Sequence, residues 1–227
     1  MNFPGRASRR ALTLAAIAVL LLAAGAFAWS ARDRSASLSP RPQSEKPVLL
    51  LVTSLPLIFG EQFSLEAHGS EALDALETRY RVQPIGVTDA GSLRQARLLL
   101  MAHPMAQPAE ALVDLDRWVR SGGRLLLLAD PILQWPSSRP LGDPLRPPPG
   151  FADTGLLKHW GLTLAAPADL RSTNPSCTVT SDGLVARCAI GAGEATVIAD
   201  ADFLNVEATG QSDRLELLIE ELERLER

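Results

Sequence analysis

The stretch RLLLMAHPMAQPAEALVDLDRWVRSGGRLLLLADP, residues 97–131, decides the fold of this protein. It contains two strand-like segments, at 97–102 and 124–129, each of which begins with an arginine, continues with five apolar residues and is followed by a polar residue and a proline. Apolar runs of this length are typical of strands buried on both faces of a parallel sheet. Between them, apolar residues recur at spacings of three and four, as on the buried side of a helix that starts near Pro108 and ends at Gly122-Gly123. The stretch therefore predicts a strand, a helix and a second strand.

The same alternation extends toward both ends of the chain. Apolar runs at 48–53 and 195–199 predict two more central strands, and the segment 81–87 predicts a shorter strand, which Pro84 favours at a sheet edge. Helical spacing predicts helices at 70–80, near 154–160 and at 213–227. Apolar strands that alternate with helices indicate an α/β fold, a flavodoxin-like parallel sheet with helices on both faces.

An antiparallel hairpin is inserted near the end of this pattern. Residues 177–190 alternate around Asp182-Gly183, which is a strong turn signal. A two-residue turn there places Cys177 directly opposite Cys188, as a hydrogen-bonded pair with Cα atoms about 5.5 Å apart. In an oxidising compartment this pair can form a cross-strand disulfide. The alternative is that both cysteines are small buried hydrophobic residues.

The N-terminal part of the sequence predicts a membrane anchor. Residues 11–29 carry no charge, and a helix of that length spans roughly 28 Å, close to the thickness of a bilayer's hydrocarbon core. The arginines within 1–10 favour a cytoplasmic N-terminus, so a single-pass protein of the inner (cytoplasmic) membrane is expected. Ala26-Phe27-Ala28 leaves a cleavable signal peptide as the alternative. In both cases a Ser-, Arg- and Pro-rich linker at 30–47 precedes an extracytoplasmic α/β domain at 48–227, in the periplasm or outside the cell.

Composition argues against several classes of function. The chain has 227 residues, with 22 lysines and arginines against 26 aspartates and glutamates, for a net charge of −4. No large basic field is available for nucleic acid, and three histidines with two cysteines leave little material for a zinc site. The motifs G-x-S-x-G, G-x-x-x-x-G-K-[ST] and G-x-G-x-x-G do not occur. We therefore expect no nucleic-acid partner, no metal, no cofactor and no catalytic residues.

The strand ends are the first place to look for a ligand site, because open parallel sheets bind ligands beyond the carboxyl ends of their strands. The candidate ligand-binding residues at these ends are Ser54, His103, Asp130, Asp200 and Asp202. Serine and aspartate after a strand also commonly cap the next helix or brace a turn, which is the alternative.

The segment 131–150 holds seven prolines in twenty residues and cannot form regular structure. It leaves the carboxyl end of a predicted central strand and carries Trp135, Arg139 and Arg146. An exposed tryptophan flanked by arginines suits a protein interface, so these three are candidate partner-binding residues. The alternative is a solvated crossover that is pinned by one buried tryptophan.

Four segments of the chain resemble a known family. They are TSLP at 53–56, ALVDLDRWVRSGGRL at 111–125, LADP at 128–131 and GEATVIADADFLN at 193–205. Over roughly 48–205, the chain resembles the auxiliary proteins of gliding-type ABC transport systems, whose soluble domain has a glutamine-amidotransferase-like fold. The resemblance implies a membrane-tethered, extracytoplasmic domain that performs no chemistry and associates with a transporter subunit. It transfers no catalytic residue to this sequence.

The sequence is compatible with two functions. The first is a membrane-anchored, non-catalytic binding or accessory domain associated with an ABC-type transport system. The alternative is an envelope hydrolase that uses His103, Asp130 and the Asp200/Asp202 pair. The hydrolase needs His103 within about 3 Å of an acid in a concave pocket, whereas the binding domain needs only an exposed patch.

Overall fold

The computed structural model describes residues 39–60, 69–210 and 213–227. The cytoplasmic segment expected at 1–10 and the membrane anchor expected at 11–29 lie outside these residues. Within the described part of the chain, no helix is both long and apolar enough to cross a membrane.

A compact unit extends from Pro40 to Arg227. It includes residues 40–47, which the sequence assigns to the linker. The Arg41 backbone N–H donates to the Thr78 carbonyl at 2.9 Å, and the Arg41 guanidinium donates to the Glu226 carboxylate at 3.0 Å. A short 3-10 turn, η1 (Gln43–Glu45), precedes the first strand.

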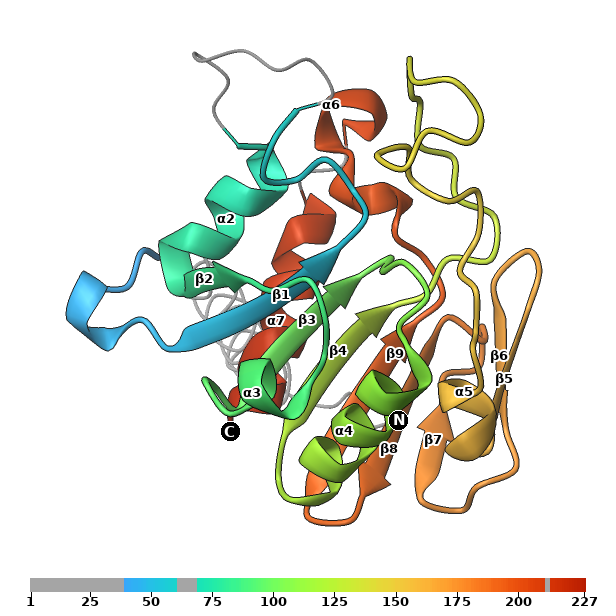
Figure 1. Cartoon of the computed structure of the whole chain (residues 1–227). Coiled ribbons are helices and arrows are strands. Elements are labelled where there is room, and N and C mark those ends of the chain that lie inside the picture. Colours follow the sequence, from blue (N-terminus) through green and yellow to red (C-terminus); the bar gives the residue numbers. More distant parts are fainter. Residues whose placement is uncertain (1–38, 61–68, 211–212) are drawn as a thin grey trace, which may run out of the picture. The chain divides into compact units, whose positions relative to one another are not determined.

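A seven-stranded sheet forms the centre of this unit (Figure 1). Its strands, in spatial order, are β2 (Arg81–Pro84), β1 (Val48–Thr53), β3 (Leu98–Ala102), β4 (Arg124–Leu128), β9 (Gly193–Ile198), β8 (Val185–Ile190) and β7 (Cys177–Val179). The first five are parallel, and β8 and β7 are antiparallel to their neighbours. Among the parallel strands alone the order is 2-1-3-4-5, one of the two common orders of doubly wound sheets.

Helices cover both faces of the sheet (Figure 1). One face packs against α2 (Glu71–Arg79), η2 (Asp202–Leu204), α6 (Val206–Thr209) and α7 (Asp213–Glu226). The other face packs against α3 (Ala90–Leu93), α4 (Ala109–Arg120) and α5 (Leu156–His159). The mixed α/β class, the mostly parallel sheet and the helices on both faces therefore agree with the sequence prediction.

The central strands are buried on both faces, as their continuous apolar runs predict. In β3, Leu99 and Met101 pack into the layer that contains α4, whereas Leu98, Leu100 and Ala102 pack into the layer that contains α2 and α7. Successive side chains of a strand point to opposite faces, so a run without polar residues needs cover on both.

The helix α4 has the boundaries that its sequence predicts. Its buried stripe is formed by Ala111, Leu115 and Val119, at spacings of four. Gly122, two residues beyond its last turn, has φ +108, a conformation that L side chains rarely adopt. The Gly122 N–H donates to the Val119 carbonyl at 2.9 Å and so closes the helix end.

A second hairpin, β5 (Leu162–Ala165) and β6 (Asp169–Ser172), is not predicted by the sequence pattern. Its strands have four residues each, and of these only Leu162 and Leu170 are fully buried. Alternation over so short a stretch is too weak to distinguish a strand from a loop. The Ala166–Pro167 peptide bond in its turn is cis.

The predicted register of the β7–β8 hairpin is confirmed, because Cys177 lies opposite Cys188. The prediction that the two cysteines form a hydrogen-bonded pair is wrong. The Gly183 N–H donates to the Thr180 carbonyl, and the Thr180 N–H donates to the Val185 carbonyl, both at 2.9 Å. The turn is therefore wider than two residues, and the cysteines occupy a non-hydrogen-bonded pair with Cα atoms 4.0 Å apart. Their sulfur atoms are joined in a disulfide.

We expect Gly193→Ala to destabilise the domain by roughly 1–3 kcal/mol or more, measured by urea denaturation. A Cβ at this position would lie 2.0 Å from the Val119 carbonyl oxygen and 2.3 Å from the Gly123 carbonyl oxygen. Both are backbone atoms, which cannot move aside as the end of a flexible side chain can. Gly86→Ala is the control, since a Cβ there meets nothing within 4 Å. Equal losses in the two variants would contradict the explanation.

Candidate functional site

The carboxyl ends of β1, β3, β4 and β9 lie along one edge of the sheet, because these strands are parallel neighbours. The five candidate ligand-binding residues follow these ends, and the structure divides them into two groups. Asp130, Asp200 and Asp202 form one cluster, and Ser54 and His103 form a separate pair.

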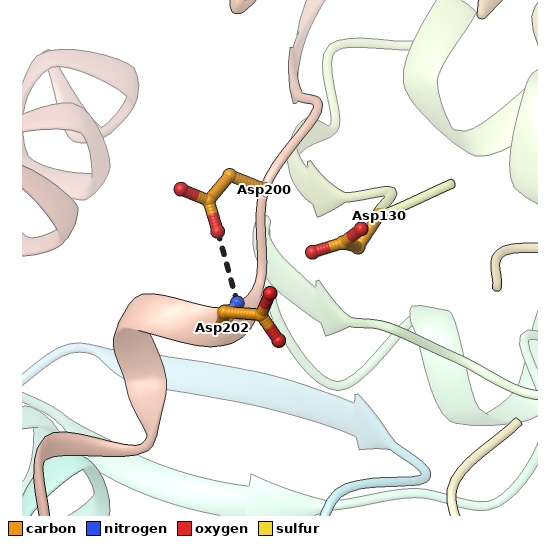
Figure 2. A group of neighbouring side chains, drawn as sticks. All are labelled: Asp130, Asp200 and Asp202. Carbon is orange, nitrogen blue, oxygen red and sulfur yellow. Dashed lines mark hydrogen bonds between the residues drawn. The ribbon is translucent and has the colours of Figure 1, made fainter. Parts of the chain in front are cut away.

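The three aspartates come from two adjacent strand ends (Figure 2). Asp130 follows β4, and Asp200 and Asp202 follow β9, its neighbour in the sheet. Each contributes a carboxylate oxygen to a set whose members all lie within 4.8 Å of one another. All three also border a hollow of about 320 Å³.

Asp130 is nearly fully buried, with 4% of its surface exposed. Its Oδ1 accepts from the Ile132 N–H at 2.8 Å, and its Oδ2 accepts from the Ala201 N–H at 3.0 Å. The carboxylate thus ties the start of the proline-rich segment to the turn after β9. This is the turn-bracing role that the sequence leaves open for such residues.

The other two carboxylates also accept hydrogen bonds. Asp200 accepts from the Asp202 N–H at 2.9 Å, as Figure 2 shows, and from the Arg214 guanidinium at 3.0 Å. Asp202 accepts from the Gln134 N–H at 2.7 Å. Every member of the cluster therefore has a bonding role within the fold.

Burial and the neighbouring carboxylates both act on Asp202. Partial burial raises the pKa of Asp202 above its ordinary value, and the nearby charges of Asp130 and Asp200 raise it further, although the Gln134 N–H lowers it. Three clustered carboxylates are the oxygen ligands that a hard divalent cation such as Mg²⁺ or Ca²⁺ prefers. These are the residues that could hold a cation. The sequence predicts no metal, and nothing beyond the acidic cluster points to one.

His103 is fully buried at the end of β3. It has φ +45, an uncommon conformation for a residue with a side chain. Its Nε2 lies 3.0 Å from the Pro148 carbonyl oxygen, so Nε2 carries the proton, and its Nδ1 has no hydrogen-bond partner among the described residues. Burial lowers the pKa of His103, although the Pro148 carbonyl and the Asp130 charge act in the opposite direction. The side chain is therefore neutral at pH 7.

The contacts of Ser54 and His103 do not form a catalytic pair. The Ser54 hydroxyl donates to the backbone carbonyl of His103 and not to its imidazole. The imidazole bonds a carbonyl oxygen, and no hydrogen bond joins it to a described carboxylate. A base needs an acceptor nitrogen aimed at its nucleophile, and this geometry supplies none.

The candidate partner-binding residues of the proline-rich segment are half-buried. Trp135 packs against the apolar core layer that contains α2 and α7. The Arg139 guanidinium lies 3.5 Å from the Asp143 carboxylate, and Arg146 donates to the Arg139 carbonyl. The Trp135 contact faces the core, and the two arginine contacts lie within the segment itself, so its most exposed side chains are others.

Several large apolar side chains of this region are exposed, and the sequence pattern did not predict them. Leu141 is 87% exposed and Leu145 is 67% exposed, both in the proline-rich segment. Phe59 in the loop after β1 is 71% exposed, and Met105 after β3 is 49% exposed. Phe59, Met105 and Leu145 line one hollow of about 440 Å³, together with Arg139. The signal in the sequence was leucine between prolines, in a segment that cannot bury it in a strand or helix.

No protein family model matches the chain, and no curated protein matches it. Among solved structures, the chain is similar to the N-terminal domain of mmIFT52, with a TM-score of 0.52 and 14% identity, over 75% of this chain and 93% of that one. It is also similar to the cytoplasmic protein STM1381 from Salmonella typhimurium LT2, with a TM-score of 0.50 and 9% identity, over 78% and 99% of the two chains.

A third similar structure is the exo-beta-1,4-mannosidase Op5Man5 from Opitutaceae bacterium strain TAV5, with a TM-score of 0.42 and 14% identity. The match covers 78% of this chain but only 36% of the mannosidase. At 14% and 9% identity, the similarities to mmIFT52 and STM1381 show the α/β fold alone.

We expect Asp130→Ala to lower the free energy of unfolding by about 1–3 kcal/mol, because it leaves two backbone N–H groups, of Ile132 and Ala201, without an acceptor. Asp130→Asn keeps one acceptor oxygen and should lose less. Chemical denaturation of the two variants measures the difference. An alanine variant as stable as the wild type would show that the carboxylate does not brace this edge.

Asp202→Asn should raise the melting temperature at pH 7. A raised pKa means that the folded state disfavours the ionised carboxyl, so the charge costs stability above the folded pKa. The amide removes that charge, and its oxygen can still accept from the Gln134 N–H. As the pH falls below the ordinary value of 3.8, the gain should disappear, because Asp202 is then protonated in both states.

Asp182→Asn is the matched control, and its expected effect on the melting temperature is the opposite of that of Asp202→Asn. Hydrogen bonds from the Thr180 hydroxyl and the Leu184 N–H lower the pKa of Asp182, so its charge stabilises the fold above its unfolded pKa. This variant should lower the melting temperature at pH 7, and the loss should shrink as the pH falls through the folded pKa. Parallel pH profiles for the two variants would contradict both assignments.

Proposed function

We propose that this protein is a membrane-anchored, non-catalytic accessory domain that docks a membrane-protein partner, with a subunit of an ABC-type transport system as the expected partner. The anchor is residues 11–29, and the soluble domain is extracytoplasmic and amidotransferase-like in fold. The transporter and the finer fold come from the family resemblance, which covers roughly residues 48–205. The contacts of the described residues support the docking role.

The observation that carries the proposal is the exposed apolar surface at the carboxyl edge. Leu141, Leu145, Phe59 and Met105 come from three different loops, and three of them line the same 440 Å³ hollow. Exposed apolar side chains gathered at a hollow are typical of a protein-binding surface. The core contact of Trp135 and the contacts of Arg139 and Arg146 within the segment restrain this surface, which reduces the entropy lost on binding.

The disulfide is consistent with an extracytoplasmic domain. Cys177 and Cys188 are bonded in the structure. Such bonds persist mainly in oxidising compartments. This agrees with export of the domain by the predicted anchor.

The hydrolase is the weaker candidate. Its distinguishing requirement is a hydrogen bond between His103 and an acid, and the His103 imidazole instead bonds the Pro148 carbonyl. Asp130 uses both carboxylate oxygens to accept backbone N–H groups. A group already held in this way is poorly placed to accept a proton from a nucleophile.

The test is site-specific photocrosslinking of the full chain in its native membranes. A photoreactive residue at Leu141 should form an adduct that mass spectrometry identifies as a membrane subunit of an ABC-type transporter. The control position is Leu217 on α7, which is 59% exposed and belongs neither to the proline-rich segment nor to the hollow. Leu141→Asp combined with Leu145→Asp should abolish copurification of the same subunit.

Two results would contradict the proposal. One is the absence of a transporter adduct from Leu141 under conditions in which Leu217 labels equally well. The other is hydrolysis of an ester or amide substrate by the purified protein that Asp130→Asn abolishes.

A further inference from the structure

A basic hollow lies at the amino edge of the sheet, on the opposite side from the carboxylate cluster. It has a volume of about 360 Å³ and lies where β1, β3 and β4 begin and where α7 ends. Figure 1 places the C-terminus near this edge. Three arginines line the hollow: Arg97, Arg124 and Arg227.

Two of these arginines have no ionic partner among the described residues. Arg97 is exposed, and the hydrogen bond that its guanidinium makes to a described residue is a long one, 3.4 Å, to the Gly122 carbonyl. Arg227 is exposed as well, and no ion pair joins it to a described carboxylate. Their guanidinium groups therefore keep donors available to a ligand.

The acids at this edge are already engaged. Glu194 lies 3.5 Å from Arg124 but also pairs with Arg224, so one carboxylate serves two guanidinium groups. Glu226, the one acid in the wall of the hollow, is held by both oxygens at 3.0 Å from Arg41. The hollow therefore carries a net positive charge.

This charge is local and contrasts with the rest of the domain. Residues 39–227 contain 17 lysines and arginines against 25 aspartates and glutamates. A general basic surface does not explain three arginines around one hollow in such a domain. The planar guanidinium group binds carboxylates and phosphates through paired hydrogen bonds, and a phosphodiester presents two oxygens for such a pair.

The position of the hollow indicates where the oxyanion comes from. Its wall includes Pro47, the last residue of the predicted linker, and Val48, the first residue of β1. The wall also includes the apolar side chains of Ala96 and Leu98, which can contact the carbon atoms of an esterified phosphate. We propose that this hollow binds the phosphodiester headgroup of an anionic phospholipid. This inference rests on the proposed membrane anchoring.

The test measures hydrogen exchange of the full chain in neutral detergent micelles. The probes are dihexanoyl phosphatidylglycerol, dihexanoyl phosphatidylcholine and inorganic phosphate, each titrated separately. The anionic lipid should slow exchange of the amides at 95–98, and it should do so at lower concentration than the other two probes. Arg97→Gln with Arg227→Gln should weaken this apparent affinity at least tenfold, since each lost charged hydrogen bond costs about one order of magnitude.

Arg94→Gln is the matched control, because Arg94 is exposed on the same loop but does not line the hollow. It should leave the protection unchanged. Both arginines to be replaced are exposed, so the double variant should keep its fold, which its melting temperature verifies.

Three results would overturn the inference. They are the absence of protection by the anionic lipid, equal protection by phosphatidylcholine, and protection by inorganic phosphate alone. The measurement uses soluble probes and requires neither a bilayer nor a transporter. Failure here therefore leaves the partner-docking proposal standing, and failure of the photocrosslinking leaves this one standing.

Discussion

The burial of β3 and β4 on both faces is the constraint on which the rest of the structure depends. Leu99, Leu100, Leu125 and Leu126 have no exposed surface, and each such side chain contributes about 1.5–3 kcal/mol when it is removed from water. Strands of this kind are stable only between two layers, so helices must cover both faces. Where the central strands end, at the two edges of the sheet and in the loops that leave them, polar groups can again reach solvent. The position of every candidate site follows from this arrangement.

The sequence predicts the fold correctly for elements that are buried by both layers. It does not predict the elements that lack such burial. The apolar runs of β1, β3, β4 and β9 and the stripe of α4 are strong local signals, and the structure agrees with them. The hairpin of β5 and β6 covers only part of one face, so its strands are short and carry little pattern. Whether the two cysteines form a hydrogen-bonded or a non-hydrogen-bonded pair depends on the number of residues in one turn. The residue types of that turn fit both a shorter and a longer turn.

The sequence predicts which residues lie at the candidate site, but it does not predict which of them contact one another. Sequence reasoning placed all five strand-end residues at the correct edge, because parallel strands share their carboxyl ends. It could not determine that Asp130 meets Asp200 and Asp202, since that depends on β9 pairing with β4 across about 70 residues of sequence. Nor could it identify Leu141 as exposed and Trp135 as inward-facing. Exposure in a proline-rich segment depends on tertiary contacts and not on periodicity.

The two edges of the sheet differ in charge, and this difference suggests how one small domain could serve two contacts. Basic residues gather at the amino edge because helices favour cations at their C-terminal ends, which here lie beside the strand starts. Acids gather at the carboxyl edge because they brace turns and begin helices. At the carboxyl edge His103 is neutral, and both carboxylate oxygens of Asp130 accept backbone hydrogen bonds. The two edges carry hollows of different character. The hollow at the carboxyl edge is apolar, and the hollow at the amino edge is cationic. A domain that connects a lipid surface to a protein partner needs such a separation, because the two contacts must not compete for the same face.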